Sequence, residues 1–189
     1  TVAGAWSTAN ALNTARYAGG GAGITTAALY ASGTAPPGDA PQTELFNGTN
    51  WTEVNDVNND RNGLENQGVG TQSAAMIFGG YDDAGNAVVD TEQWNGTNWT
   101  EVNNVNQGSG YGGGAGTSTA AVYAGGFGNG SSRNALTETW NGTNWTEVND
   151  LNTGRYNIGS SNAAPSTSMI VFGGGPPNTG ATEQWNGTN

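Results

Sequence analysis

The chain has 189 residues and a formal net charge of −11, from 15 acidic residues against four basic ones, and it contains neither His nor Cys. This balance argues against nucleic-acid binding by phosphate neutralisation and against an anionic membrane surface, and the missing Cys excludes thiolate nucleophiles and zinc–thiolate sites. Hydrophobic residues make up 34% of the chain and glycine accounts for 33 residues, and the short, regularly placed apolar runs predict a folded all-β protein.

The chain begins with half of a motif that recurs later. Trp6-Ser7-Thr8, within residues 1–12, matches the Trp-Thr-Glu of later copies. A Gly- and Ala-rich stretch over residues 18–23 follows, and its small side chains predict an innermost strand beside a crowded axis. A flexible glycine-rich loop is the alternative interpretation. The apolar run over residues 27–30 then predicts a strand packed on both faces.

The next element is a hairpin motif that recurs with little change. Its clearest copy spans residues 91–103, further copies span 43–55 and 137–149, and its first half returns at 182–189. Both arms alternate in polarity and carry aromatic, Thr and Val residues, which favours half-buried strands. The Asn-Gly between them is the strongest short-range signal for a hairpin turn. The aromatic residues that flank the turn are expected to pack against each other.

The tryptophan after each turn sets the length of the repeat. Trp6, Trp51, Trp99 and Trp145 are separated by 45, 48 and 46 residues, and strand-rich repeats of about 40–50 residues predict propeller blades. We expect one domain of four blades, each with four antiparallel strands, over about residues 13–55, 56–103, 104–149 and 150–189. Residues 1–12 supply the half-hairpin that residues 182–189 lack, so the N-terminal strand is predicted to complete the last blade.

Each apolar run ends in small residues, and a variable loop leads from there to the hairpin. This order of features, seen as Met76-Ile77-Phe78-Gly79-Gly80 followed by Trp94 and Trp99, resembles the kelch repeat. The same order occurs in the third unit, from Val122 to Trp145. Arginine before the inner strand is also kelch-like, at Arg16, Arg61 and Arg155, and Ser109 replaces it in the third unit.

The resemblance implies an all-β, four-bladed kelch-like β-propeller. Kelch propellers usually have more blades, so two alternatives to a closed ring remain: two chains combine, or the chain belongs to a longer array. The copper chemistry of kelch-type galactose oxidases needs His and Cys ligands, so no cofactor and no metal are expected. The repeated Asn-Gly-Thr-Asn-Trp-Thr-Glu-Val-Asn stretch also resembles repeats in structural and tail-fibre-like proteins of marine bacteriophages.

Repeated carboxylates are the first candidates for chemistry. They form two columns, which are Glu44, Glu92, Glu138 and Glu183, and Glu53, Glu101 and Glu147. A carboxylate pair about 5–10 Å apart could serve a glycosidase, but residues repeated with the blade are expected to be structural. The three repeated arginines are predicted to pair with carboxylates, because a buried guanidinium must be paired.

Asp82-Asp83 offers oxygen ligands for calcium without the EF-hand spacing, so an acidic turn is expected there. The hairpin Asn-x-Thr sequons match the acceptor for N-glycosylation in eukaryotic secretory proteins, and turn geometry is the preferred explanation for them.

The missing catalytic chemistry and the fold analogy together predict a non-catalytic recognition or structural module. We expect it in a virion or on another extracellular surface, where loops on one face bind a glycan or a host-surface protein. Other virion proteins are further possible partners. Nucleic acid is not expected, nor is membrane insertion, since no apolar run approaches the ~18 residues of a membrane span. The alternatives are a carbohydrate hydrolase or lyase that uses Asp and Glu, and a pure assembly spacer.

The candidate ligand-binding residues are aromatic residues that occur once outside the repeat register, tyrosines that follow an arginine at a blade end, and two of these arginines. They are Tyr17, Tyr81, Tyr111, Phe127, Tyr156, Arg16 and Arg155.

Overall fold

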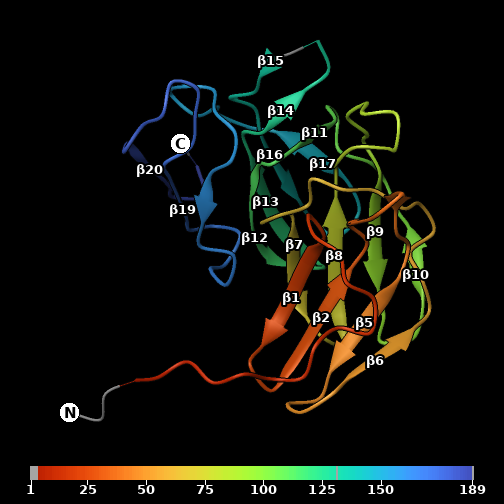
Figure 1. The fold of residues 1–189 in the computed structure, drawn as a ribbon. Helices are drawn as coiled ribbons and strands as arrows, with labels where there is room; N and C mark the ends of the chain where they lie inside the picture. Colours follow the sequence, from red (N-terminus) through yellow and green to blue (C-terminus); the bar gives the residue numbers. More distant parts are fainter. Residues whose placement is uncertain (1–3, 131, 189) are drawn as a thin grey trace.

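The computed structural model describes residues 4–130 and 132–188, and none of these residues forms a helix. It therefore contains no helix long enough to cross a membrane among those residues. Four antiparallel sheets stand around one axis as the blades of a four-bladed β-propeller (Figure 1). The predicted all-β fold with four propeller blades is confirmed.

The first three blades each have four strands in up-and-down order from the axis outward. Blade 1 contains β1 (Gly20–Ile24), β2 (Ala27–Ala31), β5 (Thr43–Phe46) and β6 (Trp51–Val54). Blade 2 contains β7 (Gly68–Thr71), β8 (Ala74–Phe78), β9 (Thr91–Trp94) and β10 (Trp99–Glu101). Blade 3 contains β12 (Gly113–Thr117), β13 (Ala120–Ala124), β16 (Thr137–Trp140) and β17 (Trp145–Glu147).

Blade 4 has only three strands among the described residues, β18 (Gly159–Ser160), β19 (Met169–Phe172) and β20 (Thr182–Trp185). Two smaller sheets lie in the loops outside the blades. One pairs β3 (Thr34–Ala35) with β4 (Gly38–Asp39), and the other joins β11 (Ser109–Gly110), β14 (Phe127–Gly128) and β15 (Ser132–Arg133).

The repeated hairpin forms as predicted. In blade 2, Trp94 lies opposite Trp99 in the ladder, and a four-residue loop separates them. Gly96 has φ 94°, a left-handed conformation that favours glycine, and the Asn95 side-chain oxygen accepts the backbone N–H groups of Thr97 and Asn98 at 2.9 Å. The two indole rings tilt against each other at 5.5 Å between centroids.

The inner strands approach one another at backbone distance, which explains their glycine content. A Cβ atom at Gly68 on β7 would lie 2.6 Å from the carbonyl oxygen of Gly21 on β1. Across the axis, the Asn66 amide of blade 2 donates to the carbonyl of Ile158 in blade 4 at 3.0 Å. A contact between opposite blades indicates a small ring. The predicted inner strands are therefore confirmed, and the loop interpretation is wrong.

The core consists of three clusters, one at each junction between successive blades. The second strands of blades 2 and 3, β8 and β13, pack one face against the preceding blade and the other face against the following blade. On β8, Ala75 and Ile77 join the cluster with blade 1, while Met76 and Phe78 join the cluster with blade 3. The third cluster joins blades 3 and 4. No fourth cluster joins blade 4 to blade 1 among the described residues, and Ile170 and Phe172 on β19 are 38% and 47% exposed.

The predicted closing strand is not formed. Residues 4–12 carry no strand, run away from the rest of the molecule in Figure 1, and leave Trp6 fully exposed. One physical reason is visible. The segment has Ala9 where the other copies carry Val, so it has less apolar surface to bury.

Candidate functional site

The loops that follow β8 and β13 build one face of the propeller, which we call the loop face. Gly79-Gly80 turns the chain sharply after β8, with φ of 64° and 101°. The Gly80 N–H then donates to the Ser109 carbonyl of blade 3 at 3.0 Å, and the Gly126 N–H donates in the same way to the Arg155 carbonyl of blade 4. The loops of one blade are thus fixed on the next blade, and β14 and β15 lie on this side (Figure 1).

Four predicted ligand residues meet on this face, although they come from three different blades. Tyr81 packs on Tyr111 with ring centroids 5.4 Å apart, and Phe127 packs on Tyr156 at 4.8 Å. The Tyr81 hydroxyl donates to the Phe127 carbonyl, which joins the two pairs. We call these four residues the loop-face aromatic cluster.

Tyr111 is held in an unusual conformation within this cluster. Its φ is 60°, in the left-handed region where a bulky side chain is strained, and Gly63 takes the same place in blade 2 with φ 70°. The Tyr111 N–H donates to the Gly63 carbonyl, and its carbonyl accepts from Asn157. Burial raises the pKa of the Tyr111 hydroxyl, with further increases from nearby Glu65 and Tyr17. The equivalent residues Ala18 and Asn157 are also left-handed, so the blade imposes this conformation and the sequence places an aromatic ring on it in blade 3.

The remaining members of the cluster differ in how far they face solvent. Tyr81 is buried, and burial raises the pKa of its hydroxyl to about 12. Tyr111, Phe127 and Tyr156 are half-buried, so parts of their rings face outward. Tyr17, the fifth predicted aromatic residue, is 64% exposed and is tied to Thr34 by two backbone hydrogen bonds. It stands beside the cluster and does not stack on it.

A hollow of about 260 Å³ opens beside Tyr111 at the axis. Its lining residues are Glu65, Asn66, Tyr111, Asn157, Ile158 and Gly159. Glu65 is the one charged residue among them, and burial raises the pKa of its carboxyl. An aromatic ring with amide groups and a carboxyl beside it can stack on an apolar face and hydrogen-bond to hydroxyl groups.

Sequence reasoning missed the polar lining of this hollow. A signal for Asn157 was available, because it takes the position of Gly63 two residues after the arginine, and Asn tolerates the left-handed conformation that it adopts with φ 54°. Asn66 also has a left-handed φ, of 64°. Glu65 carries no comparable signal, since nothing in its spacing distinguishes it from a surface carboxylate.

The two arginines on the predicted site list lie beneath the loop face. Arg16 pairs with Glu44, with 2.5 Å between Nη1 and Oε1, and its side chain is fully buried. Arg155 pairs with Glu183, and its side chain is 3% exposed. Arg61 pairs with Glu92 at 2.6 Å in the same position of blade 2. The prediction that the three repeated arginines pair with carboxylates is confirmed. Their guanidinium groups form ion pairs inside the blades.

The other candidate constellations have structural roles. Glu44, Glu92 and Glu138 are buried, and each accepts hydrogen bonds from the backbone and side chain of an asparagine. Asp82 accepts the backbone N–H and the amide of Asn86, as an acidic turn does. Among the described residues, no group of three or more Asp or Glu side chains is placed to hold a metal ion.

No protein-family model matches the chain, and a search of curated proteins also gives no match. The kelch and bacteriophage resemblances therefore rest on the repeat pattern, while the four-bladed ring rests on the strand topology.

Proposed function

We propose that the protein is a non-catalytic recognition module that binds a neutral glycan through the loop-face aromatic cluster and the adjoining hollow. The observation that carries the proposal is Tyr111, a bulky residue held at a left-handed position where another blade has glycine. Its ring lies beside a hollow lined with amide groups, a combination suited to sugars, which present apolar faces edged by hydroxyl groups.

The charges near the hollow support a neutral ligand. Glu65 lines it, and Asp39 also acts on the Tyr111 hydroxyl. Burial raises the pKa of Asp39, and the Asn62 amide donates to both of its carboxylate oxygens at 3.0 Å. Arg133 is exposed and lies in β15 opposite Phe127, where its guanidinium donates to the Pro176 carbonyl, and it does not line the hollow. With a net charge of −11, the molecule would repel acidic sugars.

The carboxylate arrangement supports binding without catalysis. A hydrolase needs one carboxyl to act as an acid and another to act as a base or nucleophile beside the substrate. Glu44, Glu92 and Glu138 are instead buried in the blades, where arginine or asparagine donors occupy their carboxylates. Display in a virion or on another extracellular surface is also part of the proposal, and its support is the resemblance to bacteriophage fibre-like repeats.

A glycan array probed with the fluorescently labelled chain tests this proposal. We expect neutral oligosaccharides to bind and their sialylated or sulfated forms to bind more weakly. Tyr111→Ala should weaken the strongest interaction about tenfold or more, which corresponds to about 1.4 kcal/mol. Trp6→Ala is the matched control, because it removes an exposed aromatic residue that lies away from the hollow. Binding that survives Tyr111→Ala unchanged, or that needs an acidic sugar, contradicts the proposal.

A further inference from the structure

Blade 2 carries two residues that the other blades lack, Glu65 and Asn66. In blades 1, 3 and 4, the residue opposite the end of the second strand comes four positions after the arginine position, at Gly20, Gly113 and Gly159. In blade 2 the same place falls at Gln67, directly before β7 and six positions after Arg61. The insertion breaks the repeat, so the common construction of the blades does not explain it. Both inserted residues line the hollow beside Tyr111.

The insertion forms a tight turn whose two ends are fixed inside the molecule. The Gln67 N–H donates to the Leu64 carbonyl at 2.8 Å, which closes the turn around the two inserted residues. Asn66 has a left-handed φ of 64°, as the third residue of such a turn requires. Leu64 and Gln67 are fully buried, and the Gln67 amide donates to carbonyls of blades 2 and 3 at 2.8 and 3.1 Å. The turn is therefore held rigidly at the axis.

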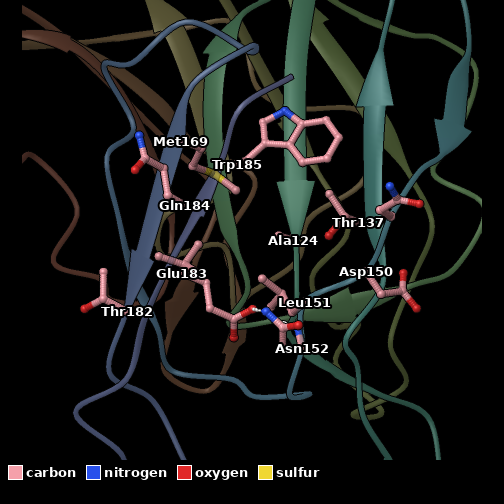
Figure 2. A pocket seen from close by; sticks show the side chains of 12 residues that line it. Ala124, Thr137, Asp150, Leu151, Asn152, Met169, Thr182, Glu183, Gln184 and Trp185 are labelled. Carbon is pink, nitrogen blue, oxygen red and sulfur yellow. Dashed lines mark hydrogen bonds between the residues drawn. The ribbon is translucent and has the colours of Figure 1, made fainter. Parts of the chain in front are cut away.

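The two inserted side chains are used differently. The Asn66 amide donates to the Ile158 carbonyl across the axis. Glu65 is exposed, its carboxyl forms no ion pair with the described residues, and the hydrogen bond that it receives comes from its own backbone N–H. The repeated glutamates are occupied instead, as Figure 2 shows for Glu183, which accepts the backbone N–H and the amide of Asn152 at 2.7 and 2.8 Å. Glu65 thus presents a free acceptor to the hollow.

The hollow limits the size and the chemistry of what Glu65 can meet. Its volume of about 260 Å³ lies below the ~300–1,000 Å³ of sites for drug-sized ligands, so it has room for a single sugar ring. A carboxylate only accepts hydrogen bonds, and its two oxygens can accept from two neighbouring hydroxyl groups at once. Such charge-assisted hydrogen bonds are roughly twice as strong as those between neutral groups. The Tyr111 ring beside Glu65 offers a stacking surface for the apolar face of the same sugar.

We infer that Glu65 determines the specificity of this site by accepting two adjacent hydroxyl groups of the terminal sugar of a neutral glycan, while Tyr111 stacks on that sugar. The inference rests on the proposed glycan binding at the loop face and names the part of the glycan that is recognised. A terminal sugar that lacks this pair of hydroxyls leaves the carboxylate without its donors, and a site built to hydrogen-bond a hydroxyl rejects such a ligand strongly.

An array of neutral oligosaccharides that end in glucose, galactose or mannose tests this inference. Each is printed beside derivatives whose terminal sugar lacks either the 2,3-pair or the 3,4-pair of hydroxyls. At least one derivative should bind about tenfold or more weakly than its parent. Glu65→Gln should weaken binding of the parent to a similar degree and should change binding of that derivative little, because the lost interaction is the same one.

Glu147→Gln is the matched control for Glu65→Gln. It makes the same chemical change at an exposed glutamate on the outer strand β17, which does not line the hollow, so it should leave all binding unchanged. Both glutamates are exposed, so both variants should fold normally by circular dichroism.

The possible failures are distinguishable. Binding that Tyr111→Ala weakens and Glu65→Gln leaves unchanged overturns the role of Glu65, while the glycan site stands. Equal weakening of parent and both derivatives by Glu65→Gln also overturns that role, because the carboxylate would then not act through adjacent hydroxyls. Binding to none of the oligosaccharides overturns the glycan site and, with it, this inference.

Discussion

Glu92 and Glu138 take the same position in successive blades but are stabilised in different ways. Glu92 receives the Arg61 guanidinium together with the backbone N–H and the amide of Asn58. Glu138 has no arginine partner, because Ser109 stands in the arginine position and bonds the Tyr123 hydroxyl. The Glu138 carboxylate depends instead on the backbone N–H and amide of Asn106 and on the N–H of Gln107. The sequence shows the substitution but not what compensates for it.

Glu92→Gln should therefore destabilise the protein more than Glu138→Gln does. The first change leaves the Arg61 guanidinium buried without its counter-charge, which costs about 3–5 kcal/mol. The second weakens hydrogen bonds to a charged group and costs about 1.5–3 kcal/mol. Urea unfolding followed by tryptophan fluorescence measures both values. Equal losses in the two variants would contradict the distinction.

Glu44, in the same column as Glu92 and Glu138, predicts that acid destabilises the fold. Burial alone would raise the pKa of Glu44, but hydrogen bonds from Arg16, Asn13 and Thr14 outweigh it and hold that pKa below its usual range. The unfolded chain then binds the proton more tightly, so this carboxylate stabilises the fold fully above its ordinary pKa of about 4.3 and loses that effect as pH falls further. Glu44→Gln should unfold with a shallower pH dependence below about pH 4.3. An identical acid dependence would refute this account of Glu44.

At the scale of the element, the hairpin was the most predictable part of the chain. Asn-Gly fixes the turn, and the flanking aromatic residues pack across it as expected. The N-terminal strand was predicted from the same pattern and failed. Its register depends on a partner edge far away in the chain, and Trp6 alone does not specify which edge it meets. A local pattern predicts a strand well but does not by itself predict its pairing.

The tryptophan after the hairpin turn should contribute different amounts to the free energy of unfolding in different blades. Trp99 is buried at a complete junction, so Trp99→Ala should cost about 3–5 kcal/mol. Trp51 faces the open junction toward blade 4 and is only half-buried, so Trp51→Ala should cost clearly less. Thermal or urea unfolding of both variants measures the difference. A Trp51→Ala loss as large as that of Trp99→Ala would indicate that blade 4 packs on blade 1 in solution.

For the whole molecule, the repeat length and the glycine-rich inner strands predicted the ring, while the open junction was not foreseen. Tyr81, Tyr111 and Phe127 were found because they break the register, Tyr156 was found because it follows an arginine, and the four residues do meet. Arg16 and Arg155 were drawn into the site by sequence proximity, although they lie beneath it in ion pairs. Neighbouring residues of an extended chain point to opposite sides, so an arginine directly before an outward-facing tyrosine points into the blade.

The open junction between blade 4 and blade 1 predicts that backbone amides are protected unequally from hydrogen exchange along the chain. Among the described residues, blade 4 has three strands, β20 pairs only with β19, and Ile170 and Phe172 on β19 are exposed. The hydrogen bonds of its amides should open at lower free energy than those of β8, whose blade lies between two four-stranded blades. Native-state hydrogen exchange under conditions where the chain is monomeric measures this. Uniform protection across all four blades would contradict the open junction.

The central claim is that the loop-face aromatic cluster is the binding surface. The most direct measurement is an NMR titration of the isotopically labelled chain with the strongest neutral glycan from the array. The account predicts shifts for the ring signals of Tyr111 and Tyr156 and for the backbone of Asn157, with the indole signals of Trp94 and Trp140 unchanged. Shifts confined to the hairpin tryptophans, or to residues around Trp185, would contradict it.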